Sequence, residues 1–492
     1  MKRITAWVLI LLLLLSSCLV AFGEGSSNYI YDSNNRQVPA PPAYLHERTF
    51  MLSDFQDMED PEGNKIKDLK AMRAACVKND KIYITCKTRL IIFSSDFEQL
   101  LYTSDKYIGL DGYKANFDSN EGIFVTDTGE YYICEPDRSC ILHFSKDNEI
   151  LRVLDNPGIT GVDAGVKYRP TQLVVDEAGR MFVIAKGMYE GIVELDSDGT
   201  FIGFYGVNEV KYNLWDLLWR KIATGSQRSK QSLWLPTDFT NICLDADGFK
   251  FATVQSSSAA ESVMRLNAKG ENILRVDGDD PYPSGDLWMN QVTSTGAPVG
   301  ASEFIAVDTN DFGVYICLDA TRNRVFAYNE DGKLLFIFGG KGNRKGYFRG
   351  PLDVDFVGEN IMVIDSTAET IELFAKTDYG TALMNAVNAQ YDYDYLTAEK
   401  YWLEALSYNQ NLFIAYSGIG RALLRRGEYE KALKYLKLGD DRKYYSKALE
   451  KVRNETLKQY LMPAIFILAG LVIVRKLTKR ALKHRKERRN AV

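Results

Sequence analysis

The side chains that most often carry catalysis are sparse in this chain of 492 residues. It contains three histidines, His46, His143 and His484, in three separate regions of the sequence. No Ser-His-Asp arrangement, zinc signature, phosphate loop or GxGxxG motif follows from the sequence, and the seven cysteines lack metal-ligand spacing. We therefore expect a binding protein rather than an enzyme, with no cofactor and no metal site.

Two aromatic-arginine pairs are the candidates for a ligand site. Tyr168 and Arg169 stand directly before a proline, and Phe348 and Arg349 stand directly before Gly-Pro. An aromatic face beside a guanidinium can hold a sugar or an anionic peptide group. The alternative is that the rings anchor local structure and the arginines only cover its edge. The two pairs are equivalent only if the elements around them repeat.

The surroundings of these pairs do repeat. Segments run from an aromatic or apolar anchor, usually through a proline, into a β-rich run that ends at Asp, with Gly a few residues later. They span residues 168–179, 235–248, 304–313 and 348–355, and residues 117–129 form a degenerate copy. A second apolar strand and a third strand follow each segment, and residues 82–93 fit the same scheme. Repeats of this length predict stacked supersecondary units.

Six such units predict an all-β, six-bladed propeller over residues 68–377, because short apolar strands between Gly, Asp and Asn turns are typical of four-stranded blades. We assign the Asp residues of the repeats to turns. The last unit has three strands before helical sequence begins near residue 379. The β-prone residues 48–52, in an N-terminal extension of residues 24–67, are expected to add its fourth strand and close the ring.

One copy of the repeat is the most regular. Its residues are Asp319, Asn323, Arg324, Val325, Tyr328, the run Phe338-Gly339-Gly340, Gly346, Phe348 and Pro351. These positions resemble the NHL repeat, and the resemblance extends with gaps over residues 68–377. It implies an NHL-like propeller. Lactonase-like relatives of such propellers use acidic residues and Asn around a calcium in the central channel, and we can match no such set in this sequence.

Both ends of the chain have membrane signals. Residues 1–23 have the basic start, apolar run and small-residue cleavage site of a signal peptide. The residues before Cys18 also resemble a lipobox, which would place a lipid on that cysteine. We favour simple cleavage, because the apolar run continues after Cys18.

Residues 458–476 are the expected transmembrane helix. Residues 461–474 are uncharged, and the next fifteen residues contain nine Lys or Arg. The apolar run is shorter than the roughly 20 residues that a bilayer needs, but Tyr460 and the basic residues can reach the two interfaces. The alternative is an interfacial or buried helix. The basic tail, residues 477–492, should remain cytoplasmic, which leaves the propeller outside the cell membrane.

The charge distribution agrees with this division. The net charge is −5; Lys2 and Arg3 contribute +2 and residues 475–489 contribute +8, so the other residues carry −15. An acidic body of this kind has no electrostatic surface for nucleic acid.

A second repeat lies between the propeller and the predicted span. Four pairs of packing positions recur 34 residues apart, for example Ala398 with Ala432 and Trp402 with Leu436. Residues 379–450 therefore resemble two tetratricopeptide repeats. The alternative is a plain helical stalk. Tyrosines exceed what the packing needs, and tyrosine is favoured at interfaces, so partner-binding candidates are Tyr391, Tyr393, Tyr395 and Tyr408.

Residues 207–233 interrupt the propeller as a helical insertion. Trp215 and Trp219 share one predicted helical face with neighbouring leucines, and basic residues follow. Exposed tryptophans with Lys and Arg would suit a partner or lipid surface. The alternative, which we favour, is a helix packed across the propeller.

The combined features resemble a family of bacterial membrane-anchored NHL-repeat proteins with a C-terminal tetratricopeptide-like segment. The resemblance implies a role beside a membrane complex such as a sugar ABC transporter. The residues themselves indicate an anchored extracytoplasmic binding or scaffold protein. A glycan or cell-wall binding module and a degenerate lactonase-type hydrolase are the two alternatives.

Overall fold

The computed structural model describes residues 28–32, 36–162, 165–206, 238–255, 262–274, 285–286 and 300–489. It divides into two compact units, Met1–Val387 and Asn388–Val492. The predicted signal peptide with Cys18, and the insertion with Trp215 and Trp219, lie outside the described residues.

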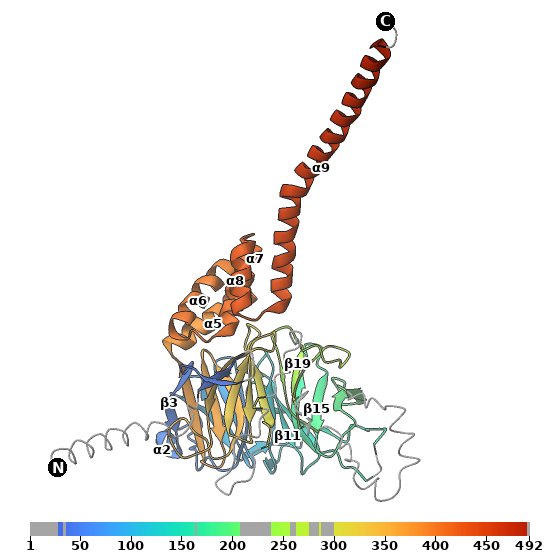
Figure 1. The fold of residues 1–492 in the computed structure, drawn as a ribbon. Coiled ribbons are helices and arrows are strands. Elements are labelled where there is room, and N and C mark those ends of the chain that lie inside the picture. The colour runs from blue at the N-terminus through green and yellow to red at the C-terminus, as the bar shows by residue number, and fades with distance from the viewer. Residues whose placement is uncertain are drawn as a thin grey trace, which may run out of the picture. The chain divides into compact units, whose positions relative to one another are not determined.

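The first unit is a six-bladed β-propeller (Figure 1). Each blade is an antiparallel sheet; in blades 1 to 5 the described strands follow sequence order, whereas the fourth strand of blade 6 comes from the N-terminal segment. Blade 1 contains β4 (Met72–Lys78), β5 (Lys81–Cys86), β6 (Arg89–Ser94) and β7 (Leu100–Ser104), and blade 2 contains β10 (Ile123–Val125), β11 (Tyr131–Glu135), β12 (Cys140–Phe144) and β13 (Ile150–Asp155). Blade 3 contains β14 (Pro170–Val175), β15 (Met181–Ala185), β16 (Ile192–Leu195) and β17 (Phe201–Tyr205).

The remaining blades complete the ring. Blade 4 has three described strands, β18 (Asp238–Leu244), β19 (Lys250–Gln255) and β20 (Val263–Leu266). Blade 5 contains β21 (Phe304–Thr309), β22 (Tyr315–Asp319), β23 (Arg324–Tyr328) and β24 (Leu334–Gly339), and blade 6 contains β25 (Pro351–Val357), β26 (Asn360–Asp365), β27 (Thr370–Lys376) and β3 (Tyr44–Phe50). Two hairpins lie outside the blades: β1 (Tyr29–Tyr31) with β2 (Gln37–Pro39), and β8 (Lys106–Ile108) with β9 (Lys114–Asn116).

The second strands are apolar along their whole length because neighbouring blades cover both faces. Every residue of β11, β15 and β22 is buried. Strands buried on both faces are expected to be continuous apolar runs rather than alternating ones. This explains why these segments could be recognised in the sequence.

The sequence predicts that the aspartates of the repeats lie in turns after the first strands, and the structure confirms this for only some of them. Asp176 Oδ1 accepts hydrogen bonds from the backbone N–H groups of Ala178 and Arg180, both at 3.0 Å. In blade 5 the equivalent turn residue is Asn310, which accepts from Val314 at 3.0 Å, whereas Asp308 lies inside β21 opposite Ile316. Asp355 likewise lies inside β25, opposite Met362. The assignment of Asp308 and Asp355 to turns was therefore wrong.

The N-terminal segment supplies the fourth strand of blade 6. Strand β3 pairs antiparallel with β27, with Phe50 opposite Ile371 and Tyr44 opposite Lys376. The sequence placed this strand at residues 48–52, but it begins four residues earlier, and Leu52 starts the short helix α2 (Leu52–Phe55). The pairing covers an edge of β27 that would otherwise be open.

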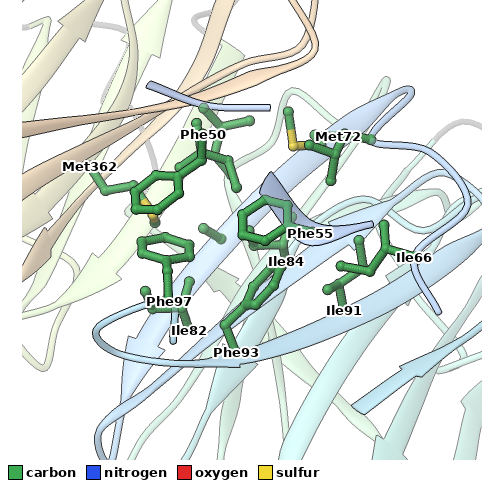
Figure 2. Close-up of a cluster of buried hydrophobic side chains, with 14 of the residues drawn as sticks. Phe50, Phe55, Ile66, Met72, Ile82, Ile84, Ile91, Phe93, Phe97 and Met362 are labelled. Atoms are coloured by element: carbon green, nitrogen blue, oxygen red, sulfur yellow. The ribbon is translucent and has the colours of Figure 1, made fainter. Parts of the chain in front are cut away.

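The same segment contributes to a hydrophobic cluster between blades 6 and 1 (Figure 2). The ring of Phe50 lies 4.3 Å from that of Phe97, and the ring of Phe55 lies 4.6 Å from that of Phe93, between ring centroids. Met362 joins them from β26. All of these side chains are buried, so residues of the N-terminal extension form part of the core that joins the first blade to the last.

Five helices follow the propeller in the chain: α5 (Asp378–Tyr391), α6 (Tyr395–Tyr408), α7 (Phe413–Arg425), α8 (Tyr429–Leu438) and α9 (Arg442–Arg489). Helices α6 to α9 belong to the second unit. Trp402 and Leu436 are fully buried there. A Cβ atom added to Gly418 would overlap the Trp402 ring, and one added to Gly420 would lie 2.5 Å from Leu436 Cγ, so the two glycines allow close helix packing.

Helix α9 has 48 residues and is long and apolar enough to cross a membrane. The side chains of its apolar segment are exposed in the chain, including Phe466 at 70%, Leu468 at 62% and Leu471 at 60%. Pro463 lies inside this helix.

Candidate functional site

The two aromatic rings of the predicted ligand site lie in the propeller core. Tyr168 packs in a cluster between blades 2 and 3 with Cys134 and Leu173. Phe348 has no exposed surface and lies 5.7 Å from the ring of Phe374, edge to face. The predicted stacking of a ligand on these rings therefore does not fit this structure, because burial in the apolar core leaves no ring face open.

The two arginines of the pairs remain at the surface. Arg169 forms a 2.6 Å ion pair with Asp137, and both side chains are about half exposed at 44% and 51%. Arg349 is exposed, and its backbone N–H donates to Asp365 Oδ2 at 2.5 Å. The backbone of Phe348 also joins two blades, because its carbonyl accepts a 3.0 Å hydrogen bond from Asn323 Nδ2. The residues of both aromatic-arginine pairs therefore make contacts that stabilise the propeller.

The tyrosines of the helical segment have mixed exposure. Tyr393 is 73% exposed and Tyr408 is 46% exposed, whereas Tyr391 and Tyr395 are partly buried. Tyr393 and Tyr395 meet edge to face at 6.4 Å, and the Arg425 guanidinium lies 5.5 Å from the Tyr395 ring centre. Tyr393 has a φ of 62°, in the left-handed region that a bulky residue rarely adopts. Tyr393 lies in the short turn between α5 and α6.

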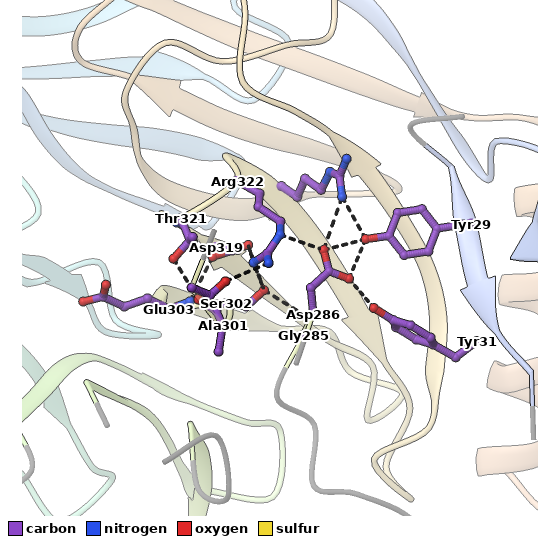
Figure 3. A network of polar contacts seen from close by, with 12 residues as sticks. Tyr29, Tyr31, Gly285, Asp286, Ala301, Ser302, Glu303, Asp319, Thr321 and Arg322 are labelled. Carbon is purple, nitrogen blue, oxygen red and sulfur yellow. Dashed lines mark hydrogen bonds and ion pairs between the residues drawn. The ribbon is translucent and has the colours of Figure 1, made fainter. Parts of the chain in front are cut away.

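A buried polar network at Asp286 was not found from the sequence (Figure 3). Asp286 is buried, with 2% of the residue exposed. It accepts 2.6 Å hydrogen bonds from the Tyr29 hydroxyl and a further hydrogen bond from the Tyr31 hydroxyl. The guanidinium groups of Arg322 and Arg324 each lie 3.2 Å from Asp286 Oδ2.

This network connects three parts of the chain. Ser302 Oγ accepts the Asp286 backbone N–H at 2.9 Å and donates to Asp319 Oδ2 at 2.8 Å. Burial, followed by the charge of Asp286, raises the pKa of Tyr29 and of Tyr31 far above the usual tyrosine value. Both hydroxyls therefore stay protonated and act as donors. A buried carboxylate with two cations and two hydroxyl donors is electrostatically compensated, so the network holds the N-terminal hairpin and Asp286 against blade 5.

A second polar group lies on the inner strands. The first strands of successive blades lie side by side around the ring. Asp308 Oδ2 in β21 accepts the backbone N–H of Phe356 in β25 at 2.8 Å, and Asp353 Oδ2 in β25 accepts that of Ala75 in β4 at 2.9 Å. An inner strand pairs with its own blade along one edge only, so its other N–H groups need acceptors. Aspartates of the preceding blade provide them.

Asp355 completes this inner carboxylate group, which we define as Asp308, Asp353 and Asp355. Asp355 is 8% exposed, and its Oδ2 has no hydrogen-bond partner in the described part of the chain. Burial raises the pKa of Asp308 to about 6 and that of Asp353 to about 7. Burial and the two neighbouring carboxylates raise the pKa of Asp355 well above its ordinary value. This group can therefore hold protons at neutral pH.

The inner carboxylate group is not arranged as a metal centre. No group of three or more His, Cys, Asp or Glu side chains among the described residues could hold a metal ion. Two of its carboxylates instead accept backbone N–H groups of the next blade. The sequence carried a signal for Asp308 alone, which precedes Gly313 by five residues, whereas Asp176, Asp245 and also Asp355 precede the next glycine by three.

Comparisons with known proteins found solved structures that are similar to this chain at low sequence identity. No protein-family model matches the chain, and no curated protein sequence matches it. Virginiamycin B lyase from Staphylococcus aureus is 11% identical, with 63% of this chain and 97% of the lyase covered and a TM-score of 0.36. A protein of unknown function from Bacteroides thetaiotaomicron is 11% identical, with 70% and 80% covered and a TM-score of 0.41.

A third similar structure is the extracellular domain of a one-component system from Bacteroides thetaiotaomicron. It is 10% identical, with 61% of this chain and 33% of that protein covered and a TM-score of 0.34. The assignment of a six-bladed propeller followed by helices rests on the strand topology of the chain itself.

Proposed function

We propose that this chain is a membrane-anchored extracytoplasmic protein whose propeller and helical segment bind or organise a membrane complex. The proposal rests mainly on the exposed apolar segment of α9. This segment is exposed throughout in the described chain, and an apolar helix with no protein around it requires lipid or another protein.

The orientation follows from charge and from the N-terminus. Nine Lys or Arg follow the apolar segment, which favours a cytoplasmic tail, and residues 1–23 have the pattern of a signal peptide. The propeller is then extracytoplasmic and the protein crosses the membrane once. If Cys18 carries a lipid instead, the same side is predicted for the propeller.

We also propose that the propeller is of the NHL type and that the helical segment is tetratricopeptide-like. The repeat residues of blade 5 support an NHL-type propeller, because Asn323 and Phe348 join adjacent blades at the positions that carry the resemblance. A tetratricopeptide-like segment is supported by successive helices that contact one another, with Ala432 and Leu436 buried as packing positions. Such segments bind partners on exposed helical surfaces, and here Tyr393 and Tyr408 provide exposed aromatic area.

The partner that best suits the resemblance is a sugar ABC transporter. Two alternative functions remain. A glycan or cell-wall module would use the exposed Arg169 and Arg349. A degenerate lactonase-type hydrolase is the other, and no group of acidic side chains among the described residues is arranged to hold its metal.

Co-purification from detergent-solubilised membranes tests the proposal. The full-length protein should recover a permease, and Tyr393→Ser with Tyr395→Ser should reduce that recovery while the propeller keeps its melting temperature. The matched control is Tyr189→Ser, which removes another half-exposed tyrosine at 50% exposure from the propeller. Recovery unchanged in the Tyr393/Tyr395 variant would contradict the helical docking surface, and glycan-array binding or metal-dependent turnover would favour an alternative.

A further inference from the structure

We propose that the part of α9 beyond the apolar segment, residues 475–486, binds the headgroups of anionic phospholipids through one basic helical face. The inference rests on the proposed membrane span, because it requires this part of α9 to begin at a bilayer surface.

Six of the seven cations of this segment are gathered on one side, and Arg485 falls on the other. At about 100° per residue, six of them fall within about 140° around the helix axis. They are Arg475, Lys476, Lys479, Arg480, Lys483 and Lys486. Leu477 and Ala481 fall on the opposite side, and all of residues 475–486 are exposed. We call these six cations the basic face of α9.

The segment has a high density of positive charge, and the nearest carboxylate in the sequence is Glu487, directly after it. Residues 475–486 contain seven Lys or Arg and no Asp or Glu. Two cations in the first part of α9 have partners close by. Arg442 lies 3.9 Å from Asp440, and Lys447 lies 4.6 Å from the centre of the Tyr444 ring. Over the described residues, Lys476, Lys479 and Arg480 make no ion pair.

The length of the apolar segment favours lipid as the occupant. Residues 461–474 span about 21 Å as a helix, against a hydrocarbon thickness of about 30 Å. The shortfall draws the flanking residues into the headgroup layer. Arg475 to Arg480 then lie within about 8 Å of helix rise from the apolar boundary, and Lys483 and Lys486 lie within about 17 Å. Lysine and arginine this close to an anionic surface are attracted to it, and a contiguous basic segment is the usual lipid-binding pattern.

Acylation of lysines in nanodiscs tests the inference with the full-length protein. Discs of phosphatidylcholine alone are compared with discs that contain phosphatidylglycerol, and a water-soluble acylating reagent is read out by mass spectrometry. We expect Lys476, Lys479 and Lys483 to react about fivefold more slowly in the anionic discs, a factor equivalent to about 1 kcal/mol per contact. Lys447 is the internal control and should react equally in both discs.

A charge-matched pair of variants separates the basic face from net charge. Lys476→Gln, Lys479→Gln, Arg480→Gln and Lys483→Gln together should abolish enrichment of phosphatidylglycerol among lipids that co-purify from equimolar mixed discs. Arg442→Gln, Lys443→Gln, Lys447→Gln and Lys451→Gln remove the same number of charges and should preserve that enrichment.

Two results would overturn the inference. One is equal acylation rates in both discs at all three lysines. The other is protection by a soluble DNA duplex without protection by phosphatidylglycerol, which would assign the face to nucleic acid. Protease protection of residues 461–474 in the discs reports separately on the span. If the span is protected and the lysines react equally, only the lipid inference fails; an unprotected span would contradict the proposed function itself.

Discussion

The Tyr29 hydroxyl donates a 2.6 Å hydrogen bond to the buried Asp286 carboxylate, 257 positions later in the chain. Together with the pairing of β3 on β27, this contact ties the N-terminal extension to two successive blades, 5 and 6. The N-terminal segment is therefore part of the propeller rather than a linker to it. Because the N-terminal segment contacts blades 5 and 6, we expect the stability of the propeller to depend on residues from both ends of its sequence.

Asp286→Asn should destabilise the ectodomain, residues 24–456, by about 3 kcal/mol, because Arg322 and Arg324 would lose the buried charge that compensates them. Urea unfolding at neutral pH measures the change. Asp311→Asn removes an exposed carboxylate of blade 5 and should change stability by less than about 0.5 kcal/mol. Equal effects of the two variants would show that the network contributes little.

Phe50→Ala should cost about 3–5 kcal/mol, because its buried ring packs between the first and last blades and leaves a cavity when truncated. Met51→Ala, at a neighbouring residue that is 50% exposed, is the control and should have a small effect. The free energy of unfolding from urea titration decides between them. If Phe50→Ala unfolds like the wild type, ring closure through β3 does not support the fold.

Stability should depend on pH through the inner carboxylate group. The pKa values of Asp308, Asp353 and Asp355 are raised in the folded state, so the native protein binds more protons than the unfolded chain between about pH 4 and the folded values. Stability contributed by these groups is then present at low pH and falls as the pH rises. Each proton contributes a slope of up to about 1.4 kcal/mol per pH unit.

Asp355→Asn removes one of these protons and should flatten the dependence. The variant should be more stable than the wild type at pH 8 and similar to it at pH 4.5, by urea unfolding at both values. Asp311→Asn again serves as an exposed control. A difference between variant and wild type that does not change with pH would contradict proton binding by Asp355.

Local sequence patterns were enough to predict the blades. The same patterns could not predict the long-range contacts. The apolar runs at β11 and β22 and the Asp or Asn turns repeat at regular intervals, so each blade has its own signal. Nothing in the sequence connects Tyr29, Asp286 and Arg324, because they meet only after blade 5 and the N-terminal hairpin have formed. The Asp286 network could therefore be found only in the folded structure.

The surroundings of the candidate site residues could not be predicted from local sequence patterns either. Tyr168 and Phe348 could be identified as anchors, but sequence alone left open whether their rings faced a ligand or the core, and packing between blades decides for the core. The sequence pattern predicts turn positions for Asp308 and Asp355, because both follow a valine and precede a glycine within five positions. Strand register, which depends on the neighbouring strands, places them inside β21 and β25 instead.

Membrane topology is the most direct test of the central claim that this is an anchored extracytoplasmic protein. Protease is added to intact spheroplasts that express the chain with a tag after Val492. The account predicts that the propeller is digested while the tag, on a fragment that includes residues 461–474, is protected and remains with the membrane. Protection of the propeller, or release of the tagged fragment from membranes by alkaline carbonate, would contradict it.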